Sequence, residues 1–119
     1  MVKISEELVA RAPVVCNPLG ERELQLRGLK IPAIRNLGVT RDQFDAIDLS
    51  DNEVQVLGNF PRQTRLSCLQ FNDNAIASVE GASMAAALPN LRRLILTGNQ
   101  LSRLEDIDEL AHLTSLGEF

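Results

Sequence analysis

The chain contains no tryptophan and no tyrosine, and aromatic residues make up only 3% of its 119 residues. The core must therefore be built from aliphatic side chains, among which leucine dominates. No apolar run reaches the roughly 18 residues that a membrane-spanning helix needs, so we expect no membrane span and no membrane partner. The first seven residues carry acids where a secretory signal peptide has an apolar block.

Cysteine and histidine are also scarce. Cys16 and Cys68 are too few for a disulfide framework, which favours free thiols in a reducing compartment, the cytosol or the nucleus. His112 has no neighbouring residues in the sequence that suggest a catalytic triad or a metal site. The acidic run 48–53 lacks the spacing and the central glycine of a calcium loop. We therefore expect no enzyme: no catalytic residues, no metal and no cofactor.

Charge is distributed unevenly along a chain whose formal net charge is −4. Residues 1–40 hold six basic and four acidic side chains, whereas residues 41–119 hold six basic and twelve acidic ones. The net charge argues against a stand-alone basic nucleic-acid binder. The separation would allow the chain to orient a charged partner, although a solvated surface explains it equally well.

Internal repeats determine the expected fold. Residues 44–54, 66–76 and 91–101 share one pattern, apolar-x-x-apolar-x-apolar-x-x-Asn-x-apolar, at periods of 22 and 25 residues. This is the leucine-rich repeat pattern. A degenerate copy precedes these three, at residues 24–31, and a further copy begins at Leu116. The pattern predicts an α/β leucine-rich repeat solenoid with short parallel strands on its concave face and with helices and turns on its convex face.

The repeats define one expected domain over residues 1–119, with an N-terminal cap over 1–20 and repeats that start near 21, 44, 66, 91 and 116. Residues 117–119 supply only half of a strand, so the C-terminal cap is missing. We expect the chain to be a fragment of a longer protein, unless a partner covers that end. An asparagine recurs in one slot, at Asn52, Asn74 and Asn99, where its amide can bond to buried backbone groups and form a structural ladder.

The segments between the strands predict further elements. Residues 81–88 have high helix propensity and are followed by a proline, and residues 105–113 also look helical. Phe60 is expected to fill the convex side of the core. Ser5 is a candidate N-cap of a helix that ends before Pro13 and covers the first coil.

The side chains between the core slots should point outward on the concave face, where repeat proteins generally bind partners. Ala46, Cys68 and Ile95 would form an apolar patch with polar rims, wide enough for one helix or loop. Alternatively, these are merely soluble outward positions. The expected set is Glu23, Gln25, Arg27, Ala46, Asp48, Ser50, Cys68, Gln70, Asn72, Arg93, Ile95 and Thr97.

Several stretches go beyond the generic repeat. Residues 22–34 read RELQLRGLKIPAI and residues 42–53 read DQFDAIDLSDNE, with MVKI at 1–4, NLG at 36–38 and LILT at 94–97. These stretches resemble the A-prime family of the U2 small nuclear ribonucleoprotein. The polar stretch 62–64, Cys68 and the Ala-rich run 82–87 depart from the family.

The resemblance implies a nuclear, non-catalytic spliceosomal protein that acts in pre-mRNA splicing. Its concave face would hold a helix of the RNA-recognition domain of a B-double-prime protein, and that partner would make most contacts to a U2 RNA stem-loop. Members of the family are longer than this chain. The implied partner contacts are Gln25, Arg27, Asp48, Ser50, Gln70, Asn72, Ile95 and Thr97. The implied RNA-phosphate contacts are Lys3, Arg22 and Lys30.

Two other functions share the repeat architecture. One is a regulatory subunit similar to phosphatase-associated repeat proteins, and the other is a cytoskeletal adaptor similar to dynein-associated ones. Neither explains the specific stretches at 22–53.

Overall fold

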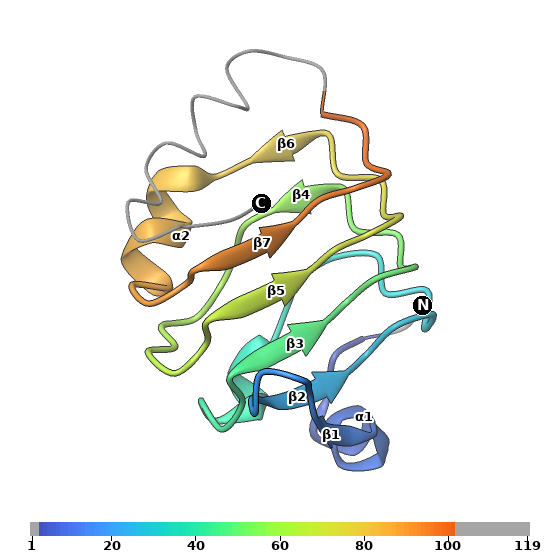
Figure 1. Cartoon of the computed structure of the whole chain (residues 1–119). Coiled ribbons are helices and arrows are strands. Elements are labelled where there is room, and N and C mark those ends of the chain that lie inside the picture. Colours follow the sequence, from blue (N-terminus) through green and yellow to red (C-terminus); the bar gives the residue numbers. More distant parts are fainter. Residues whose placement is uncertain (1–2, 102–119) are drawn as a thin grey trace.

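Each repeat forms one coil of a solenoid in the computed structural model, which describes residues 3–101 (Figure 1). The coils that begin near residues 21, 44, 66 and 91 are called the first to fourth. Each contributes one strand to a five-stranded sheet of order β1-β2-β3-β5-β7, parallel except for β1. The expected leucine-rich repeat fold is confirmed. The strands are β1 Val14–Cys16, β2 Arg22–Gln25, β3 Ala46–Asp48, β5 Cys68–Gln70 and β7 Arg93–Ile95.

The strand register follows the repeat pattern. In β2, β3, β5 and β7 the central apolar residues are direct neighbours, and all of them are fully buried: Leu24, Ile47, Leu69 and Leu94. Successive side chains of a strand point to opposite faces, so the residues on either side of this row face away from the core. The aliphatic row thereby fixes which polar side chains reach the concave face, the sheet face turned away from the core.

The three asparagines that recur in the same repeat slot each bond to the backbone of the preceding coil. Each asparagine Oδ1 accepts a hydrogen bond from a backbone N–H of the preceding coil. The N–H of Ile31 donates to Asn52 at 2.9 Å, that of Val54 to Asn74 at 3.1 Å and that of Ile76 to Asn99 at 3.0 Å. Each Nδ2 donates to a carbonyl of the preceding coil, at 2.9, 2.9 and 2.7 Å. These bonds satisfy backbone groups between the coils that water does not reach.

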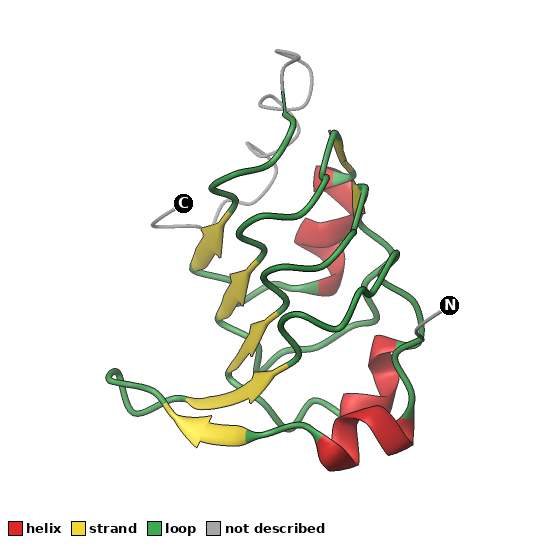
Figure 2. Cartoon of the chain, turned by 90° about the vertical axis from the view of Figure 1, so that its right-hand side faces the viewer, coloured by secondary structure: helices red, strands yellow, loops and turns green. Residues whose placement is uncertain are grey.

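Shorter elements form the other side of the first three coils (Figure 2). Strands β4 (Val56–Leu57) and β6 (Ser78–Val79) pair in parallel, helix α2 spans Gly81–Ala87, and a 3-10 helix spans Leu37–Thr40. Helix α2 confirms the helix expected at 81–88. The two-residue strands and the single 3-10 turn were not expected, because elements this short carry no hydrophobic period. The helix expected at 105–113 lies outside the described residues.

Two aromatic side chains fill the interior beside this convex layer. Phe60 is 8% exposed, and its ring meets that of Phe71 edge to face, with the centroids 6.4 Å apart. The expected core position of Phe60 is therefore confirmed.

The first coil is covered by helix α1 (Glu6–Arg11) and by strand β1. Ser5 caps the helix as expected, because its Oγ accepts a 3.1 Å bond from the backbone N–H of Leu8. Strand β1, antiparallel to β2, was not expected. It lies in a short run between Pro13 and Pro18, too short to show an alternating pattern, yet it pairs the backbone edge that β2 would otherwise leave open.

Candidate functional site

The concave face carries its side chains in aligned rows across the four parallel strands. One row is Glu23, Ala46, Cys68 and Arg93, and the next is Gln25, Asp48, Gln70 and Ile95. Two residues further along each coil come Arg27, Ser50, Asn72 and Thr97. The structure thus brings together the residues that the repeat pattern assigns to this face.

The exposure of five of these residues differs from the prediction, because five of the twelve are buried: Glu23, Ala46, Asp48, Ser50 and Cys68. Ala46 is fully buried and Cys68 is only 3% exposed, so the expected apolar patch does not reach solvent as a unit. Of its three members only Ile95 is half-buried. Ala46 and Cys68 are short side chains in a row between the longer Glu23 and Arg93, and their neighbours close over them.

Burial also changes the chemistry of the Cys68 thiol. Removal from water is the main cause that raises its pKa, from 9.0 to about 11, and nearby carboxylates raise it further against the opposing effect of Arg93. Cys68 was expected on the exposed face, and that expectation is wrong: the thiol is buried, and its raised pKa lowers the fraction of reactive thiolate further.

An ion pair crosses the concave face from the first coil to the fourth. The carboxylate of Glu21 pairs with the guanidinium of Arg93, and it also accepts bonds from the side chains of Asn17 and Ser67. Burial opposes ionisation of Glu21, but these three partners outweigh it, so the pKa of Glu21 lies below its ordinary value. The sequence held one signal for this residue: Glu21 stands where the other repeats begin with an apolar residue.

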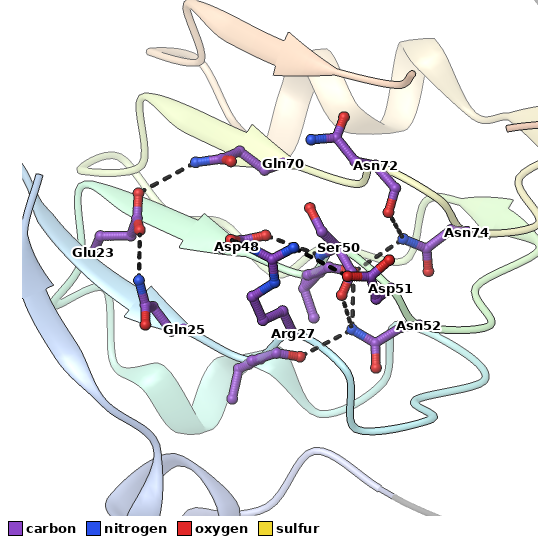
Figure 3. A network of polar contacts seen from close by, with 12 residues as sticks. Glu23, Gln25, Arg27, Asp48, Ser50, Asp51, Asn52, Gln70, Asn72 and Asn74 are labelled. Carbon is purple, nitrogen blue, oxygen red and sulfur yellow. Dashed lines mark hydrogen bonds and ion pairs between the residues drawn. The ribbon is translucent and has the colours of Figure 1, made fainter. Parts of the chain in front are cut away.

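A second carboxylate bridges strands further along the face. Glu23, only 6% exposed, accepts bonds from the side-chain amides of Gln25, at 3.3 Å, and of Gln70, at 3.2 Å (Figure 3). Gln70 lies two strands away from Glu23 in the sheet. The link therefore fixes the orientation of both amides across β3.

An arginine lies over the acidic centre of the face. Arg27 pairs with Asp51 at 3.0 Å and lies 3.8 Å from Asp48, whose side chain is 6% exposed (Figure 3). Beside them, the buried atoms Ser50 Oγ and Asn72 Oδ1 have no hydrogen-bond partner among residues 3–101. The centre of the face thus holds two carboxylates beside Arg27, and of these Asp51 is open to cations from outside.

The three basic residues proposed for RNA phosphates are not brought together. Arg22 begins β2, where its guanidinium lies 5.1 Å above the ring of Phe44, whereas Lys30 lies beyond the other end of that strand. Lys3 lines a groove with Arg35, a residue that the repeat pattern did not single out.

Other kinds of site were searched for within residues 3–101. That part of the chain holds no group of three or more His, Cys, Asp or Glu residues able to bind a metal ion. Its helices are all too short or too polar to cross a membrane. His112 lies outside the described residues.

Comparison with known proteins agrees with the leucine-rich repeat fold described above. A sequence profile described as "Leucine-rich repeat" matches residues 1–119. The chain is 52% identical over 116 residues to the U2 small nuclear ribonucleoprotein A' of Homo sapiens, covering 98% of this chain and 45% of that protein. Its identity to the corresponding protein of Arabidopsis thaliana is 48%, with coverages of 98% and 46%. The chain thus spans about half the length of the curated relatives it matches.

A solved structure gives the same result. The chain is similar to a protein in the crystal structure of the Drosophila melanogaster SNF/U2A' complex, with a TM-score of 0.94 and 47% sequence identity. The match covers 99% of this chain and 67% of that one. The chain therefore belongs to the leucine-rich repeat family and, within it, to the A' proteins of the U2 small nuclear ribonucleoprotein.

Proposed function

We propose that the chain is a non-catalytic component of the U2 small nuclear ribonucleoprotein in the nucleus and that its concave face binds the RNA-recognition domain of a B-double-prime-type protein. The observation that carries this proposal is the similarity, at 47% identity, to a chain solved in the SNF/U2A' complex. The curated relatives reported above are A' proteins, and none of those is a phosphatase subunit or a cytoskeletal adaptor.

The geometry of the concave face supports a polar, directional interface. Its carboxylates are held in place before a partner arrives, Glu23 by two amides and Asp48 beside Arg27. A partner helix with basic or amide side chains would meet the exposed carboxylate of Asp51 and the half-buried amide of Gln70. Because these groups are already ordered, less conformational entropy is lost on binding.

RNA binding then depends mainly on the partner. The net charge of −4 disfavours strong phosphate attraction by the chain alone, and Arg22 and Lys30 lie at opposite ends of β2. Lys3, Arg22 and Lys30 would add phosphate contacts only after the partner positions a U2 RNA stem-loop. Such contacts add affinity without reading the base sequence.

A binding titration tests this proposal. The chain is titrated with a B-double-prime-type RNA-recognition domain, with and without the U2 stem-loop. Gln70→Arg places a cation in the middle of the acidic face and should weaken binding about tenfold, or about 1.4 kcal/mol. Glu53→Gln, at an exposed position in the turn after Asn52, makes the same +1 change in net charge and should bind as the unmodified chain does.

The outcomes separate the alternatives. If the Gln70→Arg variant and the unmodified chain bind the partner with equal affinity, the interface does not lie on the concave face. Absence of binding by a folded chain would contradict the proposal. Tight binding of the stem-loop by the chain alone at physiological salt would contradict the division of labour between the two proteins.

A further inference from the structure

A groove lies along the first and second coils and reaches Glu80 of the third, away from the concave face. It consists of two adjoining hollows of about 430 and 300 Å³ that share Pro32, Ala33, Arg35 and Gln55 in their lining. None of the residues that line it belongs to the concave rows. A ligand in the groove and a partner on the concave face would therefore occupy different surfaces.

One wall of the groove is an unpaired strand edge. In β4 the carbonyls of Gln55 and Leu57 accept bonds from the β6 side, from Ala77 and Glu80, both at 2.9 Å. Backbone groups alternate in direction along a strand, so the N–H and C=O of Val56 point the other way, toward the first coil. There Pro32 has no N–H to offer, and the small sheet ends at β4. An open edge of this kind accepts an added strand.

The edge also carries an exposed apolar side chain. Val56 is 45% exposed and is one of four large hydrophobic side chains exposed within residues 3–101. The other three, Val14, Val15 and Leu19, lie in and beside β1. Val56 is thus an isolated anchor in the groove.

The two ends of the groove differ in charge. Lys3 lines one hollow and Arg35 lines both, and within the described residues neither makes a hydrogen bond or an ion pair. Glu80 lines the other end and lies against Gly58, where even an added Cβ would come within 2.2 Å of its Oε1. The groove therefore favours an occupant whose acidic group lies at the Lys3 end.

The walls are held by side-chain bonds to the backbone. Asn36 Nδ2 donates to the carbonyl of Ile4 at 3.2 Å, and Asn59 Nδ2 donates to the carbonyl of Ile34 at 2.7 Å. These bonds tie the N-terminal segment and the second coil to the first coil. The groove exists before any ligand binds, which reduces the ordering cost of binding.

We infer that this groove binds an extended, acidic peptide segment of a protein partner. The segment adds a strand to β4 through the backbone N–H and C=O of Val56, and its acidic side chain pairs with Lys3 and Arg35. A β-branched side chain of the segment packs on Val56. The inference does not depend on partner binding at the concave face, since the groove shares no residue with the concave rows; Lys3 alone is also a proposed RNA-phosphate contact.

Nuclear magnetic resonance titration of the 119-residue chain tests the inference. The probe is an acetylated peptide of about eight residues, two glutamates followed by alternating valine and threonine. Saturable shifts of the Val56 and Ala33 amides are expected, with the Gln70 amide unmoved. A peptide with lysines in place of the glutamates should leave all of these amides unmoved.

Matched variants check the charge requirement. Lys3→Glu combined with Arg35→Glu should weaken binding of the acidic peptide at least about tenfold. Arg92→Glu, an exposed cation on the fourth coil, should leave its affinity unchanged. Arg35→Gln removes one charge without reversing it. If the double variant does not fold, this milder variant tests the charge requirement, and it should bind the acidic peptide more weakly than the unmodified chain does.

Three results would overturn the inference. The first is an unchanged spectrum at Val56 and Ala33 in a folded chain. The second is equal affinity of the peptide for the unmodified chain and for the variants at Lys3 and Arg35. The third is a shift of these amides by an oligouridylate but not by the peptide, which would make the groove a nucleic-acid site.

Discussion

Glu21 and Arg93 lie 72 positions apart in the sequence and form an ion pair across the concave face. The pair joins the first coil to the fourth over strands β3 and β5. Leucine-rich repeats otherwise contact mainly their nearest neighbours. This long link therefore couples the ends of the described solenoid and holds the curvature of the face that a partner would meet.

Removal of the Glu21 charge should reduce both stability and its dependence on acid. The pKa of Glu21 is lowered from 4.5 in the folded chain, so its stabilising effect is present above pH 4.5 and is lost as the pH falls through the folded pKa. Glu21→Gln should cost about 1–3 kcal/mol at about pH 6 and show a smaller further loss at about pH 3.5. Urea unfolding at the two pH values measures both quantities.

The exposed Glu53→Gln variant is the control for this experiment. The Glu53 carboxylate makes no hydrogen bond or ion pair within the described residues, so the unfolding free energy of this variant should follow that of the unmodified chain at both pH values. An equal acid-dependent loss in Glu21→Gln and in the unmodified chain would contradict the role given to the ion pair.

The asparagine ladder should be costly to interrupt. Asn74→Ala leaves the N–H of Val54 without its partner in a buried position, whereas the carbonyl of Leu49 keeps a bond from Asn52. A buried group left unsatisfied costs about 1–3 kcal/mol, so the unfolding free energy should fall by about that amount. Thermal or urea unfolding measures the change.

Asn72→Ala is the matched control in the same coil. The Oδ1 of Asn72 already lacks a partner, so its loss should change stability by less than about 0.5 kcal/mol. Comparable losses in the two variants would show that the slot at Asn74 has no special structural role.

Gly28 and Gly98 occupy the same turn position in two coils, so alanine substitutions there distinguish the cost of backbone strain from that of steric overlap. Gly28 and Gly98 have φ of +70° and +76°, but only at Gly98 would a Cβ lie 2.2 Å from Asp73 Oδ1. Gly28→Ala should cost about 1 kcal/mol from backbone strain alone, and Gly98→Ala distinctly more. Equal losses in unfolding free energy would rule out the overlap with Asp73.

The two thiols should differ sharply in reactivity. Cys16 is exposed, whereas Cys68 is buried with a pKa of about 11. A raised pKa of this size reduces the thiolate fraction of Cys68 about a hundredfold near pH 8, and burial blocks the reagent as well. In a disulfide-exchange assay of the folded Cys16→Ser variant, labelling of Cys68 should be slow and should accelerate in urea. Rapid labelling without denaturant would contradict its burial.

The sequence supports prediction of the strand register, because the spacing of Leu24, Ile47 and Leu69 decides which side chains leave the core. It does not support prediction of exposure on the concave face. Whether Ala46 and Cys68 meet solvent depends on the reach of side chains from other coils, which no local period encodes. The groove at Arg35 is a similar case, since it joins Lys3, Arg35 and Gln55 from separate segments of the chain. Strand β1 was missed for another reason, because it is too short to show an alternating pattern.

The most direct test of the account is to map the partner on the folded chain by amide chemical shifts. A B-double-prime-type RNA-recognition domain is added to the isotopically labelled chain, and signals are followed on all four strands of the concave face. The account predicts that Gln25, Gln70, Ile95 and Thr97 shift while Val56 and helix α1 do not. Shifts confined to the convex side, with the concave rows unmoved, would contradict it.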